Sequence, residues 1–211
     1  MLARARLARI ARGVTKALVL SALAADPVVG RASESALDAS LRVRGIDVHA
    51  VDVVAARIKP CQGCGSCGLR TPGRCVLGDD MQEIFPRIVE SQVLVLASQV
   101  RFGTHGTPLK RVIDRFQPLM APLYTIRDGE VKFRPRYDPR PAVLGVGLLP
   151  FAGSDAAAAA EASAYREVIV RNAANLAAPC HASAVLSASD AGPLMRSALD
   201  LALTALLGDG R

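Results

Sequence analysis

A chain of 211 residues is long enough to bury one hydrophobic core. Hydrophobic residues make up 51% of it, aromatic residues only 4%, and Trp is absent, which is typical of helices packed on a buried parallel sheet. The net charge is +7, but no aromatic residues interleave with the basic ones, and no apolar run reaches the roughly 18 residues of a membrane span. We therefore expect neither nucleic-acid binding nor a membrane anchor.

The first 16 residues form a basic segment. It contains four arginines and no acid in its first 12 positions: Arg4, Arg6, Arg9 and Arg12. This pattern predicts a solvated basic lead-in helix over residues 1–16. A general attraction for phosphate-bearing ligands is the functional interpretation of the same charges. A secretory signal is the alternative, because the apolar run Ala17–Ala25 follows. That run is only nine residues long, and its removal would delete the first strand, so we expect a cytoplasmic protein.

The amino-terminal half alternates strand-like and helix-like segments. Ala17–Leu23 is a short apolar run that predicts the first strand. Ser33–Arg44 has helical spacing of apolar residues, with Gly45 as its C-terminal cap. Asp47–Val54 alternates as a second strand should.

A cysteine-containing loop follows, from Cys61 to Cys75. Asp80–Glu83 then has the D-x-x-E form of a capping box, which predicts a helix to about Val89. Gln92–Ala97 is the clearest buried strand.

The carboxyl-terminal half continues the alternation. Thr107–Leu119 is helix-like, and Met120–Arg140 is rich in proline and charge, which predicts an excursion or lid outside the core. The remaining segments predict strand, helix, strand and helix in turn: Pro141–Leu149, Asp155–Ala177, Ala182–Ser187 and Gly192–Leu207.

Repeated strand–helix alternation predicts right-handed crossovers and a parallel sheet. Ligands of such sheets bind beyond the carboxyl ends of the strands, where the strand order reverses. Three loops should meet at this rim: Ala22–Ser33, Ser98–Gly106 and Pro150–Asp155. We expect the cysteine loop at the same end.

The strongest chemical signal is Cys61-x-x-Cys64-x-x-Cys67-x7-Cys75. Four cysteines within 15 residues of a cytoplasmic protein indicate metal binding rather than disulfides. Close spacing of this kind serves iron–sulfur ligation, whereas structural zinc more often uses two separated C-x-x-C pairs. We favour a [4Fe–4S] cluster, with zinc and free thiols as alternatives. Cys180 stands alone and is interpreted as an apolar packing residue.

The stretch Ile58–Cys67, then Cys75-Val76 and Asp79-Asp80-Met81, resembles the NADPH-dependent FMN reductase-like proteins, and most closely their iron–sulfur flavoprotein branch. Ser98 through Lys110 to Asp114-Arg115 matches that family's second flavin loop and the helix after it. The resemblance implies one flavodoxin-like domain over residues 1–211. It would be a three-layer sandwich with a five-stranded parallel sheet in the order 2-1-3-4-5.

The resemblance also implies an oxidoreductase. FMN would bind at the strand rim and exchange electrons with the cluster, NAD(P)H or a ferredoxin would be the donor, and a redox protein or small molecule the acceptor. Members of this family are usually dimers or tetramers.

By position, the resemblance places three sets of residues on FMN. The first loop would supply Ser21, Arg31, Ser33 and Ser35, with the serines at a helix start. The second would supply Ser98, Gln99, Val100, Arg101, Phe102 and Gly103. The third would supply Pro150, Phe151 and Gly153. The first loop departs from the usual Gly-Ser-Pro-Arg, because Asp26 and Pro27 stand within it. Asp26 would repel a phosphate.

His105 lies in a loop expected near the flavin, where it would deliver a proton to a reduced substrate; a histidine without a role is the alternative. The rival to the whole interpretation is a flavodoxin-like module without FMN. Such a module would keep its cysteine loop for metal binding, sensing or stability.

Overall fold

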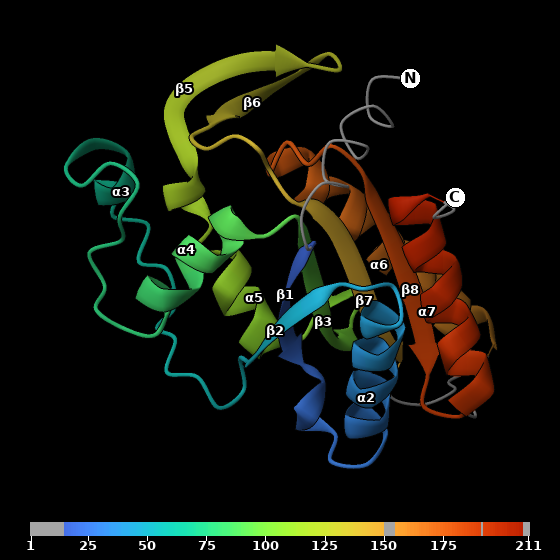
Figure 1. Cartoon of the computed structure of the whole chain (residues 1–211). Coiled ribbons are helices and arrows are strands. Elements are labelled where there is room, and N and C mark those ends of the chain that lie inside the picture. Colours follow the sequence, from blue (N-terminus) through green and yellow to red (C-terminus); the bar gives the residue numbers. More distant parts are fainter. Residues whose placement is uncertain (1–14, 150–154, 191, 209–211) are drawn as a thin grey trace.

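The computed structural model describes residues 15–149, 155–190 and 192–208. The predicted lead-in helix therefore lies outside the described residues, except that Lys16 is the first residue of strand β1. Figure 1 shows a central sheet with helices on both faces. No helix in these ranges is long and apolar enough to cross a membrane.

The main sheet confirms the predicted topology. Its parallel strands follow the order β2-β1-β3-β7-β8, which is the flavodoxin-like order 2-1-3-4-5. Their bounds are β1 Lys16–Ala22, β2 Asp47–Asp52, β3 Val93–Arg101, β7 Ala142–Leu149 and β8 His181–Ser187. A short strand β4, Thr104–His105, pairs antiparallel with the end of β3.

Each face of the sheet carries its own apolar core, because alternate residues of a strand point to opposite faces. Helices α2 (Val29–Arg42) and α7 (Gly192–Leu207) cover one face, with Leu37 and Leu199 fully buried. The other face is covered by three helices: α4 Met81–Glu90, α5 Thr107–Ile113 and α6 Asp155–Asn175.

The bounds of α2 and α5 differ from the predicted ones, and two short helical elements were not predicted. Helix α2 begins at Val29, four residues before the predicted start at Ser33. Helix α5 ends at Ile113, and residues Gln117–Leu119 form a separate 3-10 turn, η2. A four-residue helix, α3 (Ser66–Leu69), lies inside the cysteine loop, and another 3-10 turn, η1 (Leu23–Ala25), follows β1.

The excursion after residue 120 is an antiparallel hairpin of β5 (Met120–Arg127) and β6 (Glu130–Pro135). The strands of the main sheet run downward in Figure 1, and the hairpin lies at the top, beyond their amino ends. Arg127 Nη2 donates to the carbonyl of Ala174, at the end of α6. The hairpin is thus at the end opposite to the β1–α2 connection, and a lid over a flavin at the rim of the same chain does not fit this geometry.

Candidate functional site

The cysteine loop is an open, glycine-shaped segment. Cys61 and Cys64 are exposed, whereas Cys67 and Cys75 are half-buried. Gly63 and Gly65 have φ of 64° and 68°, a left-handed conformation that glycine adopts without a steric penalty. These two residues turn the chain between successive cysteines and lead it into α3.

The four thiols share one electrostatic neighbourhood. Burial raises the pKa of Cys67, and the nearby Cys75, Cys64 and Cys61 raise it further. Hydrogen bonding from Ser66 lowers the pKa of Cys64. Even so, no three His, Cys, Asp or Glu side chains of the described ranges are gathered closely enough to hold a metal ion. The structure brings the cysteines into one loop but does not draw their sulfurs into a finished ligand set.

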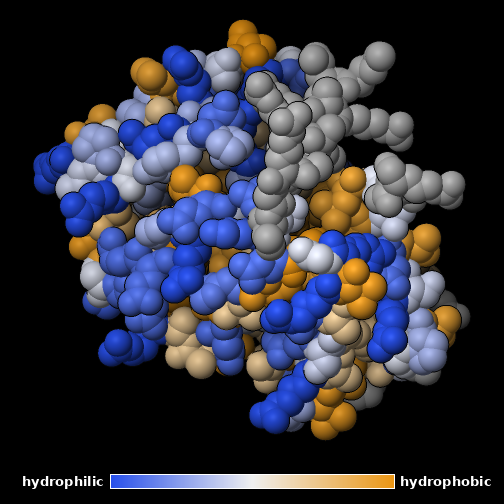
Figure 2. All heavy atoms as spheres, in the orientation of Figure 1, coloured by the Kyte–Doolittle hydropathy of each residue, from blue (hydrophilic) through white to orange (hydrophobic). Residues whose placement is uncertain are grey.

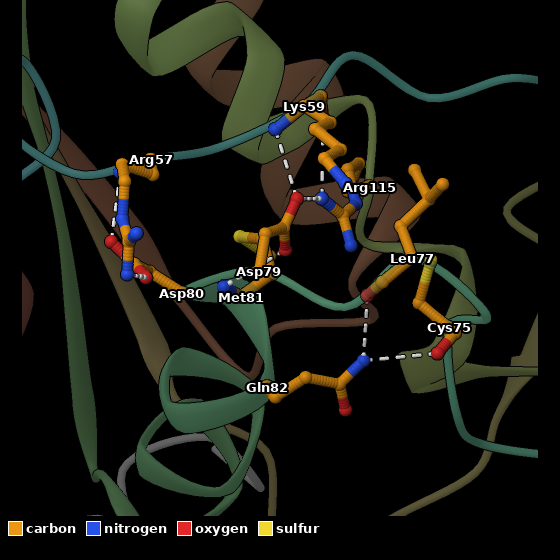
Figure 3. Close-up of polar contacts among 9 residues, drawn as sticks. All are labelled: Arg57, Lys59, Cys75, Leu77, Asp79, Asp80, Met81, Gln82 and Arg115. Carbon is orange, nitrogen blue, oxygen red and sulfur yellow. Dashed lines mark hydrogen bonds and ion pairs between the residues drawn. The ribbon is translucent and has the colours of Figure 1, made fainter.

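The base of this loop is closed by hydrogen bonds between its entry and its exit (Figure 3). The backbone N–H of Arg57 donates to Asp80 Oδ2 at 2.8 Å, and that of Lys59 donates to Asp79 Oδ2 at 2.9 Å. The Asp80 N–H returns to the Arg57 carbonyl at 3.3 Å. The predicted helix start at Asp80 is one residue from the observed start at Met81, but the predicted capping hydrogen bond is absent. The Asp80 side chain makes no cap to α4, because its carboxylate binds the loop entry.

A buried ion pair joins this base to the end of α5. Arg115 and Asp79 side chains are only 1% and 3% exposed, and Arg115 Nη1 donates to Asp79 Oδ2. The same nitrogen donates to the Lys59 carbonyl at 3.2 Å. Asp79 Oδ1 accepts the Met81 N–H at 3.2 Å, so this carboxylate also fixes the start of α4.

Burial and pairing act in opposite directions on this pair. Burial raises the pKa of Asp79, but hydrogen bonds from Arg115 and Lys59 outweigh it, so the pKa lies below its usual value. Burial likewise lowers the pKa of Arg115, yet Asp79 and the Cys75 sulfur together raise it above its usual value. Both groups are therefore charged at neutral pH. Sequence reasoning included Asp79 and Arg115 in the family motif but assigned them no role, because the pairing spans 36 positions of the chain.

The loop segment that carries Cys75 is held by helix α4. Gln82 of α4 donates through Nε2 to the carbonyls of Cys75 and Leu77, each at 2.9 Å. Figure 3 shows the Cys75 sulfur turned toward the guanidinium of Arg115. Of the four cysteines, Cys75 is thus the one attached to the folded core.

The cysteine loop does not lie at the predicted rim. Helix α3 contacts β5 and η2, and a Cβ added at Gly68 would meet Pro122 of β5 at 3.5 Å. Figure 1 shows α3 beside the base of the hairpin, away from the β1–α2 connection at the bottom of the view. The expectation that the cysteines and the first loop share one end is wrong for residues 61–75.

The β1–α2 connection is occupied by its own carboxylates. Asp26 Oδ1 accepts the backbone N–H groups of Val28 and Val29, both at 3.0 Å. Ser21 is buried, and its Oγ donates to Glu34 Oε1 at 2.5 Å. Gly30 allows the helix to pack closely, because a Cβ there would lie 1.9 Å from the Leu23 carbonyl oxygen. Glu34 was not among the site residues predicted from the sequence. Its position one turn after Arg31 is the only signal that could have indicated that it lies at this loop.

Ser33 and Ser35 were predicted to hold the flavin phosphate at a helix start, and this predicted position is wrong. Ser33 lies in the second turn of α2, is fully buried, and donates to the Val29 carbonyl at 2.8 Å. Ser35 is exposed farther along the same helix, and of the four predicted residues Arg31 is the one that is exposed in the first turn. The N-cap of α2 is Val28, which makes no side-chain cap hydrogen bond, and the Asp26 carboxylate holds the Val28 and Val29 amides at this earlier start.

The second loop is a tight β-turn between β3 and β4. Phe102 and Gly103 have φ of 51° and 71° between the paired residues Arg101 and Thr104, as in a type I′ turn. Phe102 is 98% exposed at its tip. Gln99 Oε1 accepts from Arg101 Nη2 at 2.9 Å. The side chains of Ser98 and Val100 are buried, so these two side chains do not face a rim ligand. The predicted residues Pro150, Phe151 and Gly153 lie outside the described residues.

His105 is not the loop proton donor that was predicted. It is 4% exposed, and burial, with a contribution from Lys110, lowers its pKa to about 4. Asn172 Nδ2 donates to His105 Nε2 at 2.9 Å, which leaves Nδ1 as the protonated nitrogen, 3.4 Å from Ser98 Oγ. At neutral pH the imidazole is uncharged, and both of its nitrogens are engaged. Together with Lys110 and Asp114 it lines a cavity of about 440 Å³ between α5, α6 and the hairpin.

The sequence model of the NADPH-dependent FMN reductase family matches residues 16–168, well over half of the chain. The chain belongs to this family. The iron–sulfur flavoprotein of Methanosarcina thermophila is 29% identical over 99 residues, covering 46% of this chain and 51% of that protein. An iron–sulfur flavoprotein of Archaeoglobus fulgidus is 37% identical over 92 residues, covering 42% of this chain and 40% of that protein. The chain thus spans about half, or less, of the length of these relatives.

Solved structures show the shared fold. An NAD(P)H:quinone oxidoreductase from Methanothermobacter marburgensis superimposes with a TM-score of 0.66 at 16% identity, covering 93% of this chain and 99% of that chain. An FMN-dependent NADH-azoreductase from Bacillus anthracis, in complex with FMN, superimposes with a TM-score of 0.56 at 10% identity, covering 92% and 98%. In this family member, the first loop was predicted to bind the FMN phosphate and the cysteine loop an iron–sulfur cluster.

The cysteine loop fits an iron–sulfur cluster in the chemistry of its four thiols and in the buried guanidinium beside Cys75, although the four sulfurs are not gathered around one point. Thiolates are the ligands that such clusters use. Arg115 Nε and Nη2 are buried and have no hydrogen-bond partner, although buried donors are nearly always paired. An anionic, sulfur-rich group beside Cys75 would supply the missing acceptors.

The first loop fits an anionic oxygen, but the chain supplies one itself. The start of a 14-residue helix offers backbone N–H groups and a partial positive charge to anions. The Asp26 carboxylate takes up the amides of Val28 and Val29. A phosphate could bind this helix start with the exposed Arg31 beside it, provided that Asp26 turns away.

Proposed function

We propose that this member of the FMN reductase family is an FMN-dependent oxidoreductase of the iron–sulfur flavoprotein type, which exchanges electrons between FMN and a cluster held by Cys61, Cys64, Cys67 and Cys75. The observation that carries the proposal is the cysteine loop itself. Its base is closed by Asp79 and Asp80 and anchored to α5 by the buried Arg115, in a chain whose relatives are named iron–sulfur flavoproteins.

The two groups would divide the chemistry. When bound, flavin takes up two electrons as a hydride and releases them singly, which suits a cluster that accepts one electron at a time. The chain's own contribution is to bind and orient. The α2 start and Arg31 would hold the flavin phosphate, and the β3–β4 turn with Gln99 and Arg101 would lie beside the ring. The family's description names NADPH, and NAD(P)H is the donor that we propose.

We also propose a homo-oligomer assembled through the hairpin. Several large hydrophobic side chains are exposed on it: Leu123, Tyr124, Ile126 and Val131. Ile126 and Val131 lie opposite each other across the hairpin and are both largely exposed, and Figure 2 shows separate hydrophobic residues among hydrophilic ones at the top of the molecule. Clustered exposed apolar side chains mark interaction surfaces. A second copy seated here would also lie close to the cysteine loop, since α3 contacts β5.

A module without FMN is the second candidate, and Asp26 is the observation that favours it. Its carboxylate places negative charge where the flavin phosphate would bind. The cysteine loop, the Asp79–Arg115 pair and the fold would be the same in either case. Only the cofactor content separates the two functions.

The test is the cofactor content of the protein after purification without oxygen, since exposed thiol-bound clusters are destroyed by oxidation. Flavin is released by heat and identified by chromatography, and iron and acid-labile sulfide are measured per chain. FMN together with iron and sulfide supports the proposed oxidoreductase. Iron and sulfide without FMN, even after incubation with excess FMN, supports the second candidate and contradicts the first.

A further inference from the structure

Two nitrogens of the Arg115 side chain lie close to the Cys75 sulfur or to the protein interior without a well-formed hydrogen bond to the described residues. Its Nη1 is fully used by Asp79 and the Lys59 carbonyl. Its Nε and Nη2 are buried without a partner. A guanidinium is planar and its N–H bonds lie in that plane, so the donors not used by Asp79 and Lys59 point, within the plane, to other sides of the group. The Cys75 sulfur lies on such a side in Figure 3.

The surroundings of Arg115 suggest that its unused donors serve a sulfur-bound group. Asp79 neutralises its charge from one side only, and the Cys75 backbone is held in place by Gln82. A cluster with four thiolates carries net negative charge in both of its common oxidation states. Net charge and hydrogen bonds to sulfur set its reduction potential.

On the basis of the proposed function, we infer that Arg115 is a positioning residue for the cluster. Its unpaired N–H groups point at the Cys75 sulfur and at the cluster. Asp79 determines how much of the positive charge of Arg115 acts on that sulfur and on the cluster. Arg115 acts through Cys75 and binds no iron itself. It stabilises the more negative, reduced cluster and so raises the reduction potential. Asp79 has the opposite effect on the potential, although both residues stabilise the fold.

The experiment compares two variants by redox titration of the anaerobically reconstituted full chain, followed by the electron paramagnetic resonance of the reduced cluster. Arg115→Lys keeps a positive charge beside Asp79 but loses the donors that face Cys75. The reduction potential of the cluster in Arg115→Lys should be more negative than in the wild type, and loss of iron to a chelator should be about 10-fold faster. Asp79→Asn leaves the Arg115 charge unopposed, so its potential should be more positive.

The control is Arg44→Lys. Arg44 also joins two elements through an aspartate, Asp200 at 2.7 Å, but this pair lies on the α2–α7 face. Arg44→Lys should leave the reduction potential of the cluster unchanged. A purely structural pair would lower the thermal midpoint in both test variants without opposite shifts in potential.

The outcomes separate the inference from the proposed function. Opposite shifts in Arg115→Lys and Asp79→Asn support the inference. A wild-type cluster whose potential is the same in both variants overturns the inference and leaves the proposed function intact. Wild-type protein that takes up no iron and sulfide under anaerobic reconstitution overturns both.

Discussion

The carboxylate of Asp26 accepts the backbone N–H of Val29 at 3.0 Å, at the first residue of α2. The same oxygen accepts the N–H of Val28. Flavodoxin-like folds bind ligands at this helix start, since its free N–H groups and dipole favour anions. In this chain the Asp26 carboxylate accepts both of these amides, at the position where we propose that the flavin phosphate binds.

Asp26→Asn should therefore tighten FMN binding. The asparagine can still accept from Val28 and Val29, but the negative charge is gone. A charge at a helix terminus contributes about 0.3–1 kcal/mol, so the dissociation constant for FMN should fall about 2- to 5-fold, as measured by fluorescence quenching. Asp38→Asn, in an exposed pair with Arg42 on the same helix, is the matched control. Unchanged or weaker binding in Asp26→Asn would remove Asp26 from the phosphate position.

His105 should make the fold sensitive to mild acid. Its pKa is lowered from 6.5 to about 4 in the folded chain, so the unfolded state binds the proton first as the pH falls. The contribution to stability is complete above pH 6.5 and is lost between 6.5 and about 4, up to about 3 kcal/mol. His105→Gln should flatten the pH dependence of the urea unfolding midpoint in this window. An equally steep dependence in that variant would mean that His105 is not the group responsible.

The backbone of Phe102 is strained by its positive φ, and replacing this residue should raise the free energy of unfolding. Both positions of its turn have positive φ, where Asn and Gly are favoured and a bulky aromatic is not. Phe102→Asn should stabilise the flavin-free chain by about 0.5–1 kcal/mol in urea unfolding, because the exposed ring loses no packing. Phe102→Leu is the control and should give no gain. A loss of stability in Phe102→Asn would show that the ring packs in solution.

The hairpin should determine the oligomeric state. Ile126 and Val131 face each other across β5 and β6, and both are largely exposed. Changing both to Glu should lower the mass measured by light scattering, since like charges would occupy the proposed interface. Leu201→Glu, on the exposed face of α7, should leave the mass unchanged. A monomeric wild type, or a double variant of unchanged mass, would contradict the proposed assembly.

The sequence was informative where local periodicity decides structure. The alternation of strands and helices was predicted from the sequence, and the strand order from the family resemblance. Helix α7 has its predicted bounds, and α6 ends at Asn175, two residues before the predicted end. The start of α2 at Val29 was missed, four residues before the predicted start, although the Val29 amide is held there by Asp26. The fate of His105 was missed because its burial depends on Asn172 and Tyr165, which are distant in the sequence.

The candidate site was predictable in its ligands and not in its place. The spacing of the four cysteines and the glycines between them is written in one short stretch. Its position beside β5 depends on a hairpin that follows 45 residues after Cys75, at Met120. The buried Arg115–Asp79 pair is likewise a tertiary contact, which no local pattern encodes.

The measurement that tests the central claim most directly is the iron and acid-labile sulfide content of single Cys→Ser variants, purified without oxygen. Cys61, Cys64, Cys67 and Cys75 should each be required, since serine is a poor ligand for iron–sulfur clusters. Cys180→Ser is the control: its sulfur is half-buried near the Leu206 carbonyl at 3.5 Å, on the α7 side of the sheet. The account predicts iron and sulfide in the wild type and in Cys180→Ser, with loss in the other four. Wild-type protein without both elements, or zinc without sulfide, would contradict it.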